Sequence, residues 1–200
     1  APILPLLQHN DPAVRIVALH ALACCGKADA MNAVKAALDD KDEGVQDEAV
    51  RTLATWPNRW PEDATIAEPL MSLAKTGKKP AHQILALRGY LQYLQGNRNL
   101  KDDERFAKAM EVLPQVTRPD EKRLVCSVLG TVGTGPSVQQ LVAFAADATI
   151  AEEACSAIVG LAERNEMKVG KDERQKALQA VVEHSKNNQT KKKAADLMKR

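Results

Sequence analysis

Apolar residues recur along the chain at the spacing of amphipathic helices. In residues 12–25 they form the i, i+3, i+4, i+7, i+8, i+11 stripe of one helix face, namely Val14, Val17, Ala18, Ala21, Leu22 and Cys25. Asp11 before Pro12 predicts the beginning of this helix, and Gly26 predicts its end. No segment alternates apolar and polar residues with a period of two, so we predict no strands.

The same pattern recurs in five further segments. Its copies start at residues 11, 42, 79, 118, 147 and 187, so that neighbouring copies lie 29 to 40 residues apart. One column carries a small residue in every copy: Ala18, Ala49, Ala86, Val125, Ala154 and Ala194. Four positions later a large residue always follows: Leu22, Leu53, Tyr90, Leu129, Ile158 and Met198. Fixed size as well as fixed polarity predicts helices that approach each other closely.

A further helical stretch precedes each later copy, so the chain reads as helix pairs. We predict an all-α fold of about six antiparallel pairs, with second helices near residues 12–25, 43–56, 80–95, 119–132, 148–163 and 188–199. Each pair has too little apolar surface to fold alone, and stacking supplies the core. We expect one repeat domain over residues 1–200, cut from a longer protein, because the first helix of the first pair is short.

The opening of the repeated helix resembles a HEAT repeat. Asp11-Pro12-Ala13-Val14-Arg15 carries the full Asp-Pro-x-Val-Arg pattern, and Asp42-Glu43-Gly44-Val45-Gln46 keeps its Asp and Val. Periodicity extends the resemblance over nearly the whole chain, whereas the motif is sharp in only these copies. The resemblance to this armadillo-type family implies a right-handed α–α superhelix, a solenoid that serves as a scaffold or binding surface. The family has no shared catalytic residues, so none is carried over.

Composition agrees with closely packed helices. The chain is 44% apolar and 27% charged, which is ordinary for a folded protein, but only 3% aromatic, which suits an all-β core poorly. No stretch approaches the roughly 20 apolar residues of a membrane span. The net charge of +2 is too small to indicate a nucleic-acid binder. From Lys171 onward, however, nine basic residues stand against four acidic ones, and Lys191-Lys192-Lys193 fits a polar terminal cap.

The residues that could carry out catalysis or bind a metal or cofactor do not have the spacing that known motifs require. The four histidines and four cysteines match no metal pattern, and the glycine-rich segment 130–136 follows a helix rather than a strand. The acidic run 39–44 lacks the ligand spacing of a calcium loop. We therefore predict no catalytic, cofactor-binding or metal-binding residue. The cysteines fall on apolar helix positions as buried free thiols, which favours the cytoplasm, although a missing N-terminus would hide a targeting signal.

One exposed column of the second helices is a candidate binding surface. It reads His20, Arg51, Arg88, Ser127 and Ser156. In HEAT pairs the second helices typically line the concave face, so His20, Arg51 and Arg88 could form a cationic stripe there for an acidic partner. The alternative is local charge pairing on a solvated face, since Asp47 and Glu48 lie one turn before Arg51.

Trp60 and Arg59 form the second candidate, in the segment Thr55-Trp56-Pro57-Asn58-Arg59-Trp60-Pro61. Trp and Arg are enriched at binding hot spots, and Trp60 lies in an expected linker between two prolines. The alternative is that Trp60 fills a widened junction between the second and third helix pairs.

Two functions remain in competition. The first is a non-catalytic protein-interaction scaffold, which explains the repeat and the missing motifs and requires a protein partner. The alternative is a HEAT-like DNA-binding or DNA glycosylase-type enzyme that uses a basic concave face. The column loses its charge at Ser127 and Ser156, which disfavours nucleic acid. We expect a monomer, or a segment of a multidomain chain.

Overall fold

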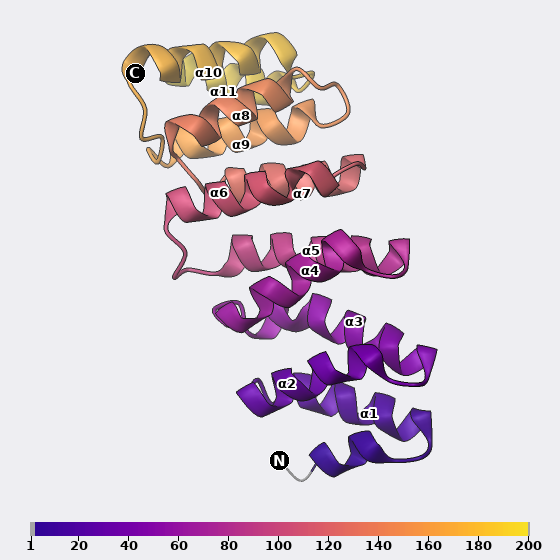
Figure 1. Ribbon diagram of the computed structural model, residues 1–200. Helices are drawn as coiled ribbons and strands as arrows, with labels where there is room; N and C mark the ends of the chain where they lie inside the picture. The colour runs from indigo at the N-terminus through magenta and orange to yellow at the C-terminus, as the bar shows by residue number, and fades with distance from the viewer. Residues whose placement is uncertain (1–2, 200) are drawn as a thin grey trace. The chain divides into compact units, whose positions relative to one another are not determined.

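The computed structural model describes residues 3–199 and is all-helical, as predicted (Figure 1). Its only extended pairing within those residues is a single bridge between Thr134 and Lys168. The chain divides into two compact units, Ala1–Asn99 and Leu100–Arg200, which are described separately. The single domain expected over residues 1–200 stays a prediction. None of the described helices is long and apolar enough to cross a membrane.

Unit 1 contains three helix pairs. Its first helices are short or interrupted: the 3-10 helix η1 (Leu4–Gln8), α2 (Ala28–Ala36) with η2 (Ala37–Asp39), and η3 (Ala64–Ile66) with α4 (Ala67–Thr76). Its second helices are α1 (Pro12–Ala23), α3 (Glu43–Arg59) and α5 (Pro80–Gly96). The second helices pack on one another in chain order, α1 on α3 and α3 on α5.

Unit 2 contains the other three pairs. Its first helices are α6 (Asp102–Val112) with η4 (Leu113–Gln115), α8 (Gly135–Ala145) and α10 (Lys171–His184). Its second helices are α7 (Pro119–Leu129), α9 (Ala151–Glu163) and α11 (Asn188–Met198). Here too the second helices pack in succession, α7 on α9 and α9 on α11.

Local sequence signals begin several of the second helices. The carboxylate of Asp11 accepts a hydrogen bond from the Ala13 amide, and that of Asp42 accepts one from the Val45 amide at 3.1 Å. The Asn187 side chain caps α11 in the same way. The end of α3 differs from the expectation, because the helix continues through Pro57 to Arg59. Trp60 is therefore the C-cap of α3 and does not lie in an irregular linker.

The small and large residues that recur in each repeat form the core of both units. Every member of the small column is buried, from Ala18 at 1% exposure to Ala194 at 0%. Their large neighbours are buried as well, apart from Met198 on the last helix, which is half-buried. Small residues let neighbouring helices approach, and the large residue four positions on fills the space beside the contact. The predicted helix register is confirmed.

One member of the predicted apolar stripe was placed wrongly. Val17 was expected in the core, but its side chain is 65% exposed, whereas Arg15 and Leu19 are buried. The buried arc of α1 is centred between Ala18 and Leu22. At 100° per residue, Val17 lies about 120° around the helix from that centre. Periodicity alone did not separate the two sides of α1, because this helix is apolar on both.

Candidate functional site

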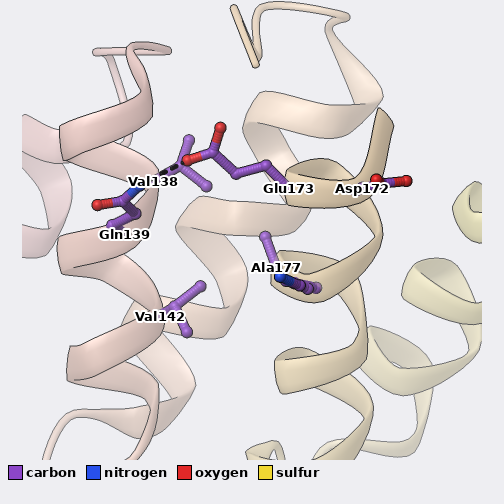
Figure 2. A pocket seen from close by; sticks show the side chains of 7 residues that line it. Val138, Gln139, Val142, Asp172, Glu173 and Ala177 are labelled. Atoms are coloured by element: carbon purple, nitrogen blue, oxygen red, sulfur yellow. Dashed lines mark hydrogen bonds between the residues drawn. The ribbon is translucent and has the colours of Figure 1, made fainter. Parts of the chain in front are cut away.

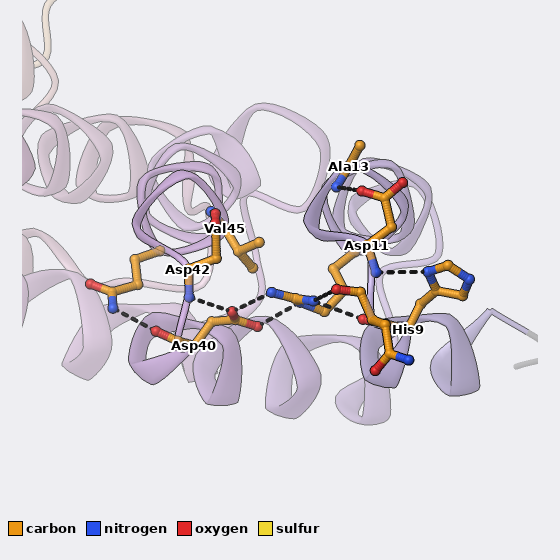
Figure 3. Close-up of polar contacts among 9 residues, drawn as sticks. His9, Asp11, Ala13, Asp40, Asp42 and Val45 are labelled. Atoms are coloured by element: carbon orange, nitrogen blue, oxygen red, sulfur yellow. Dashed lines mark hydrogen bonds and ion pairs between the residues drawn. The ribbon is translucent and has the colours of Figure 1, made fainter.

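Arg15, the last residue of the Asp-Pro-x-Val-Arg motif, ties successive repeats together (Figure 3). Its guanidinium makes two parallel bonds to Asp40, Nε to Oδ2 at 2.9 Å and Nη2 to Oδ1 at 2.8 Å. Nη1 donates to the carbonyl oxygens of His9 and Asn10. Arg15 is only 3% exposed, so this is a buried, geometrically specific ion pair. The motif therefore has a structural role in joining α1 to the turn before α3.

The same turn is held by further bonds around Asp40. The Asp42 amide donates to the Asp40 carboxylate, and the Gln46 side chain donates to the Asp40 carbonyl at 2.6 Å (Figure 3). Burial opposes ionisation of Asp40, but the hydrogen bonds from Arg15 and Asp42 outweigh it and lower its pKa. Gln83 makes the equivalent bond to the Gly77 carbonyl before α5. These bonds set the register of the second helices of unit 1.

The predicted cationic column of unit 1 contains an acid. His20 and Arg51 are both exposed, as expected, but they share Glu48. His20 Nε2 lies 2.7 Å from one Glu48 oxygen, and Arg51 Nη1 lies 3.5 Å from the other. The Glu48 side chain is only 14% exposed. The outward-facing groups are therefore the imidazole and the guanidinium, and the carboxylate lies beneath them.

Arg88, the third member of the column, is half-buried on α5. Asp47 of α3 is also paired with the start of α5: it contacts Lys79 at 2.6 Å and His82 at 2.7 Å. These bonds, first that from Lys79, lower the pKa of Asp47, and the same contact raises the pKa of Lys79. We call the side chains of His20, Arg51 and Arg88 the second-helix face; His20 and Arg51 are exposed and Arg88 is half-buried. In unit 2 the corresponding positions of the repeat are Ser127 and Ser156, both of which are exposed.

Trp60 lies against the turn that follows α1. Its Nε1 donates to the Ala23 carbonyl at 3.1 Å, and its ring occupies the space that a Cβ on Gly26 would need. Gly26 has a φ of 61°, a conformation that favours glycine. Arg59 is exposed, and its Nη1 lies 2.9 Å from the exposed Cys24 Sγ. The junction that Trp60 fills is thus between the first and second pairs, and not the expected one between the second and third.

The residue after Trp60 contacts the third pair instead. A Cβ on Gly96, at the end of α5, would lie 3.1 Å from Pro61 Cβ. In unit 2 a similar contact occurs without an aromatic residue: the backbone of Glu166 occupies the space beside Gly133, and the Lys168 amide donates to the Gly133 carbonyl at 2.7 Å. Linkers after a second helix therefore pack on a glycine of a neighbouring turn, which ties repeats together at their loops.

Two grooves lie among the first helices. Figure 2 shows the larger, of about 450 Å³, between α8 and α10. Val138, Val142 and Ala177 line it, and a 2.8 Å hydrogen bond from Gln139 to Glu173 crosses it. A smaller groove of about 220 Å³ lies between η1 and α2. Both follow from contacts between residues distant in sequence, and no local pattern indicates them.

The described residues offer little reactive chemistry. No three His, Cys, Asp or Glu side chains among them group as a metal site. Burial, together with the charge of the neighbouring Glu153, raises the pKa of Cys126 to about 12. Burial likewise raises the pKa of Cys155 to about 11. A thiol becomes a nucleophile as its thiolate, so these two cysteines act as small core residues. The expectation that all four cysteines are buried was wrong for the other two, because Cys24 is exposed and Cys25 is half-buried.

Comparison with known proteins agrees with this architecture. The family described as HEAT repeats matches residues 1–88. A crystal structure of an engineered protein from the Northeast Structural Genomics Consortium superposes with a TM-score of 0.53 and 17% identity, covering 99% of this chain and 94% of that chain. That likeness concerns the fold alone. No curated protein matches the chain. With its stacked helix pairs and its HEAT match, the chain is a HEAT-like, all-α repeat protein.

Proposed function

We propose that the chain is a non-catalytic protein-interaction scaffold whose second-helix face contacts a protein partner. The observation that carries the proposal is the placement of His20 and Arg51. They project from successive helices, α1 and α3, while each carboxylate oxygen of Glu48 is already paired, one with His20 and the other with Arg51. Rigid helices hold the donors, and the stacking of α1, α3 and α5 fixes their spacing.

An acidic partner segment suits this face. The Arg51 side chain is 65% exposed and its ion pair with Glu48 is 3.5 Å long, so most of its five donors face solvent. A partner carboxylate can bind such a guanidinium through two parallel hydrogen bonds. Trp60 is a weaker candidate, because its ring packs on Gly26 and its Nε1 is bonded to Ala23. Arg59 beside it stays exposed and can extend the contact.

A displayed library of random twelve-residue peptides tests the proposal. Peptides selected on the full chain should be enriched in Asp and Glu. Arg51→Glu should weaken the selected peptides about tenfold, measured by fluorescence anisotropy at low salt, because it replaces attraction by repulsion. Lys101→Glu is the matched control, since Lys101 is exposed and lies on unit 2. Peptides without acidic enrichment, or equal losses in both variants, would contradict the proposal.

The DNA-binding alternative is tested with the same protein. A labelled duplex should show no gel shift at 50 mM salt, because Glu48 neutralises part of the column and Ser127 and Ser156 interrupt it. A shift that disappears with rising salt and with Arg51→Glu would replace the scaffold by a nucleic-acid binder.

A further inference from the structure

The groove between α8 and α10 has an apolar interior that both of its walls supply. Val138 and Val142 project into it from α8, and Ala177 projects from α10 (Figure 2). Val138 and Ala177 are each 1% exposed and form the bottom of the groove, whereas Val142 is half-buried. Both walls are successive first helices within unit 2, and they pack on each other. A further repeat would stack on other faces of these helices and would leave the groove open.

Charged side chains at the start of α10 complete the lining. They are Asp172, Glu173 and Lys176. Asp172 and Lys176 are exposed, and Glu173 is half-buried. Within the part of the chain that the structure describes, none of the three forms an ion pair, although they lie within one turn of each other. Two acids therefore stand against one base, and the rim of the groove has a net negative charge.

The carboxylate of Glu173 is held across the groove by contacts with α8. Its Oε1 accepts a 2.8 Å hydrogen bond from Gln139, as Figure 2 shows. The carboxylate also packs on Gly135 at the start of α8, where a Cβ would lie 3.4 Å from Oε1. Among the described residues no donor binds Oε2. A fixed acceptor with an unused oxygen therefore lies beside an apolar surface.

We propose that this groove binds a lysine or arginine side chain from a basic segment of a partner protein. Such a side chain has a long apolar stem and a charged end group. The stem lies against Val138, Val142 and Ala177, and the end group donates a charge-assisted hydrogen bond to Glu173 Oε2. The site is distinct from the second-helix face, and its charge preference is the opposite one. The chain thus offers an acidic partner segment one surface and a basic segment another.

Lys176 opposes this preference and therefore provides a test of it. It follows Glu173 by three residues on α10, and its exposed ammonium repels a basic segment. Removing the charge of Glu173 should weaken binding, whereas reversing the charge of Lys176 should strengthen it. Two substitutions on one turn of α10 should thus change affinity in opposite directions, which loss of folded protein cannot do.

A displayed library of random twelve-residue peptides, selected on the full chain carrying Arg51→Ala, tests the proposal. That substitution removes the guanidinium of the second-helix face, so this proposal and the proposed function succeed or fail separately. Selected peptides should be enriched in Lys and Arg. In the same background, Glu173→Gln should raise the Kd of a selected peptide about tenfold, and Lys176→Glu should lower it about threefold, measured by fluorescence anisotropy at low salt.

Glu183→Gln is the matched control, because Glu183 is exposed on the same helix but does not line the groove. Its Kd should equal that of the Arg51→Ala protein. Selection without basic enrichment, an unchanged Kd in Glu173→Gln, or equal weakening in Glu183→Gln would overturn the proposal. Circular dichroism melting confirms that each variant is folded.

Methyl NMR locates the bound peptide. Titration of a selected peptide into methyl-labelled protein should shift the signals of Val138, Val142 and Ala177, which line the groove. The signals of Val45 and Val50 on α3 in unit 1 should stay in place. Shifts on α3 without shifts in the groove would show binding elsewhere and would contradict the proposed site.

Discussion

Arg15 of α1 and Asp40 ahead of α3 form a buried ion pair through two hydrogen bonds, 2.8 and 2.9 Å long. Arg15 also donates hydrogen bonds to the carbonyl oxygens of His9 and Asn10. This pair turns a sequence motif into a physical connection between repeats. Because Arg15 is only 3% exposed, each partner depends on the other for its hydrogen bonds.

Arg15→Ala should lower the free energy of unfolding of unit 1 by about 3 kcal/mol, since it leaves the Asp40 carboxylate and two carbonyls without their donor. Both tryptophans, Trp56 and Trp60, belong to unit 1, so urea unfolding followed by their fluorescence reports on it. Arg51→Ala is the matched control: its ion pair is exposed, and its loss should cost less than about 1 kcal/mol. Equal losses of unfolding free energy in the two variants would show that the pair between Arg15 and Asp40 has no special role.

Trp60 and Gly26 should be energetically coupled. Gly26→Ala should destabilise unit 1, because the new Cβ overlaps the Trp60 ring and the φ of 61° strains an L-residue. Trp60→Ala should cost about 2 kcal/mol through lost packing of the half-buried ring. In the double variant the clash is absent, so the combined loss should be smaller than the sum of the single losses. Additive losses, read from circular dichroism melting, would argue against the contact.

The Lys122–Asp147 pair should make unit 2 sensitive to acid. The hydrogen bond from Lys122, 2.8 Å long, and then those from Thr149 lower the pKa of Asp147 from 3.8 to about 2. The ionised form is favoured in the folded state, so this stabilisation is complete above pH 3.8 and is lost as the pH falls toward 2. In Lys122→Met the Asp147 pKa should move back toward 3.8, measured by NMR titration of the carboxyl carbon. An unchanged pKa would exclude Lys122 as the main cause.

The four thiols should react at different rates in the folded protein. Cys24 is exposed, whereas Cys126 and Cys155 are buried and have pKa values raised by burial to about 12 and about 11. Iodoacetamide at pH 8 should therefore label Cys24 within minutes and leave Cys126 and Cys155 unlabelled until urea is added. Peptide mass spectrometry distinguishes the sites. Rapid native labelling of Cys126 would show that its helix opens readily.

The sequence predicted those features that repeat locally. The small column from Ala18 to Ala194 could be found because size and polarity recur at one position of each copy, and packing depends on both. The packing of the Trp60 ring on Gly26 could not be predicted, because it joins residues far apart in the chain and depends on the backbone conformation of Gly26. Val17 was misplaced for a different reason: its apolar character indicated burial, but α1 is apolar on both sides, and Val17 lies on the side away from Ala18 and Leu22.

The sequence identified which residues belong to the candidate site, but it did not predict which charged side chains pair with each other. His20 and Arg51 were expected to be exposed and are. The alternative of local charge pairing is present as the 3.5 Å contact between Glu48 and Arg51, but the shorter Glu48 contact, 2.7 Å, is to His20 on the other helix. Cross-helix pairing depends on the rotation of each helix, which charge spacing along one helix does not fix.

Photo-crosslinking in the cells that make the protein tests the proposed binding face most directly. A photoreactive residue replaces Thr55, which is exposed one turn after Arg51 on α3, and in a second variant it replaces Asn32, which is exposed on α2. We predict a discrete crosslinked protein from position 55 that is absent from position 32 and is lost when Arg51→Glu is added. Crosslinking from position 32 alone, or from position 55 without dependence on Arg51, would contradict a partner bound at the second-helix face.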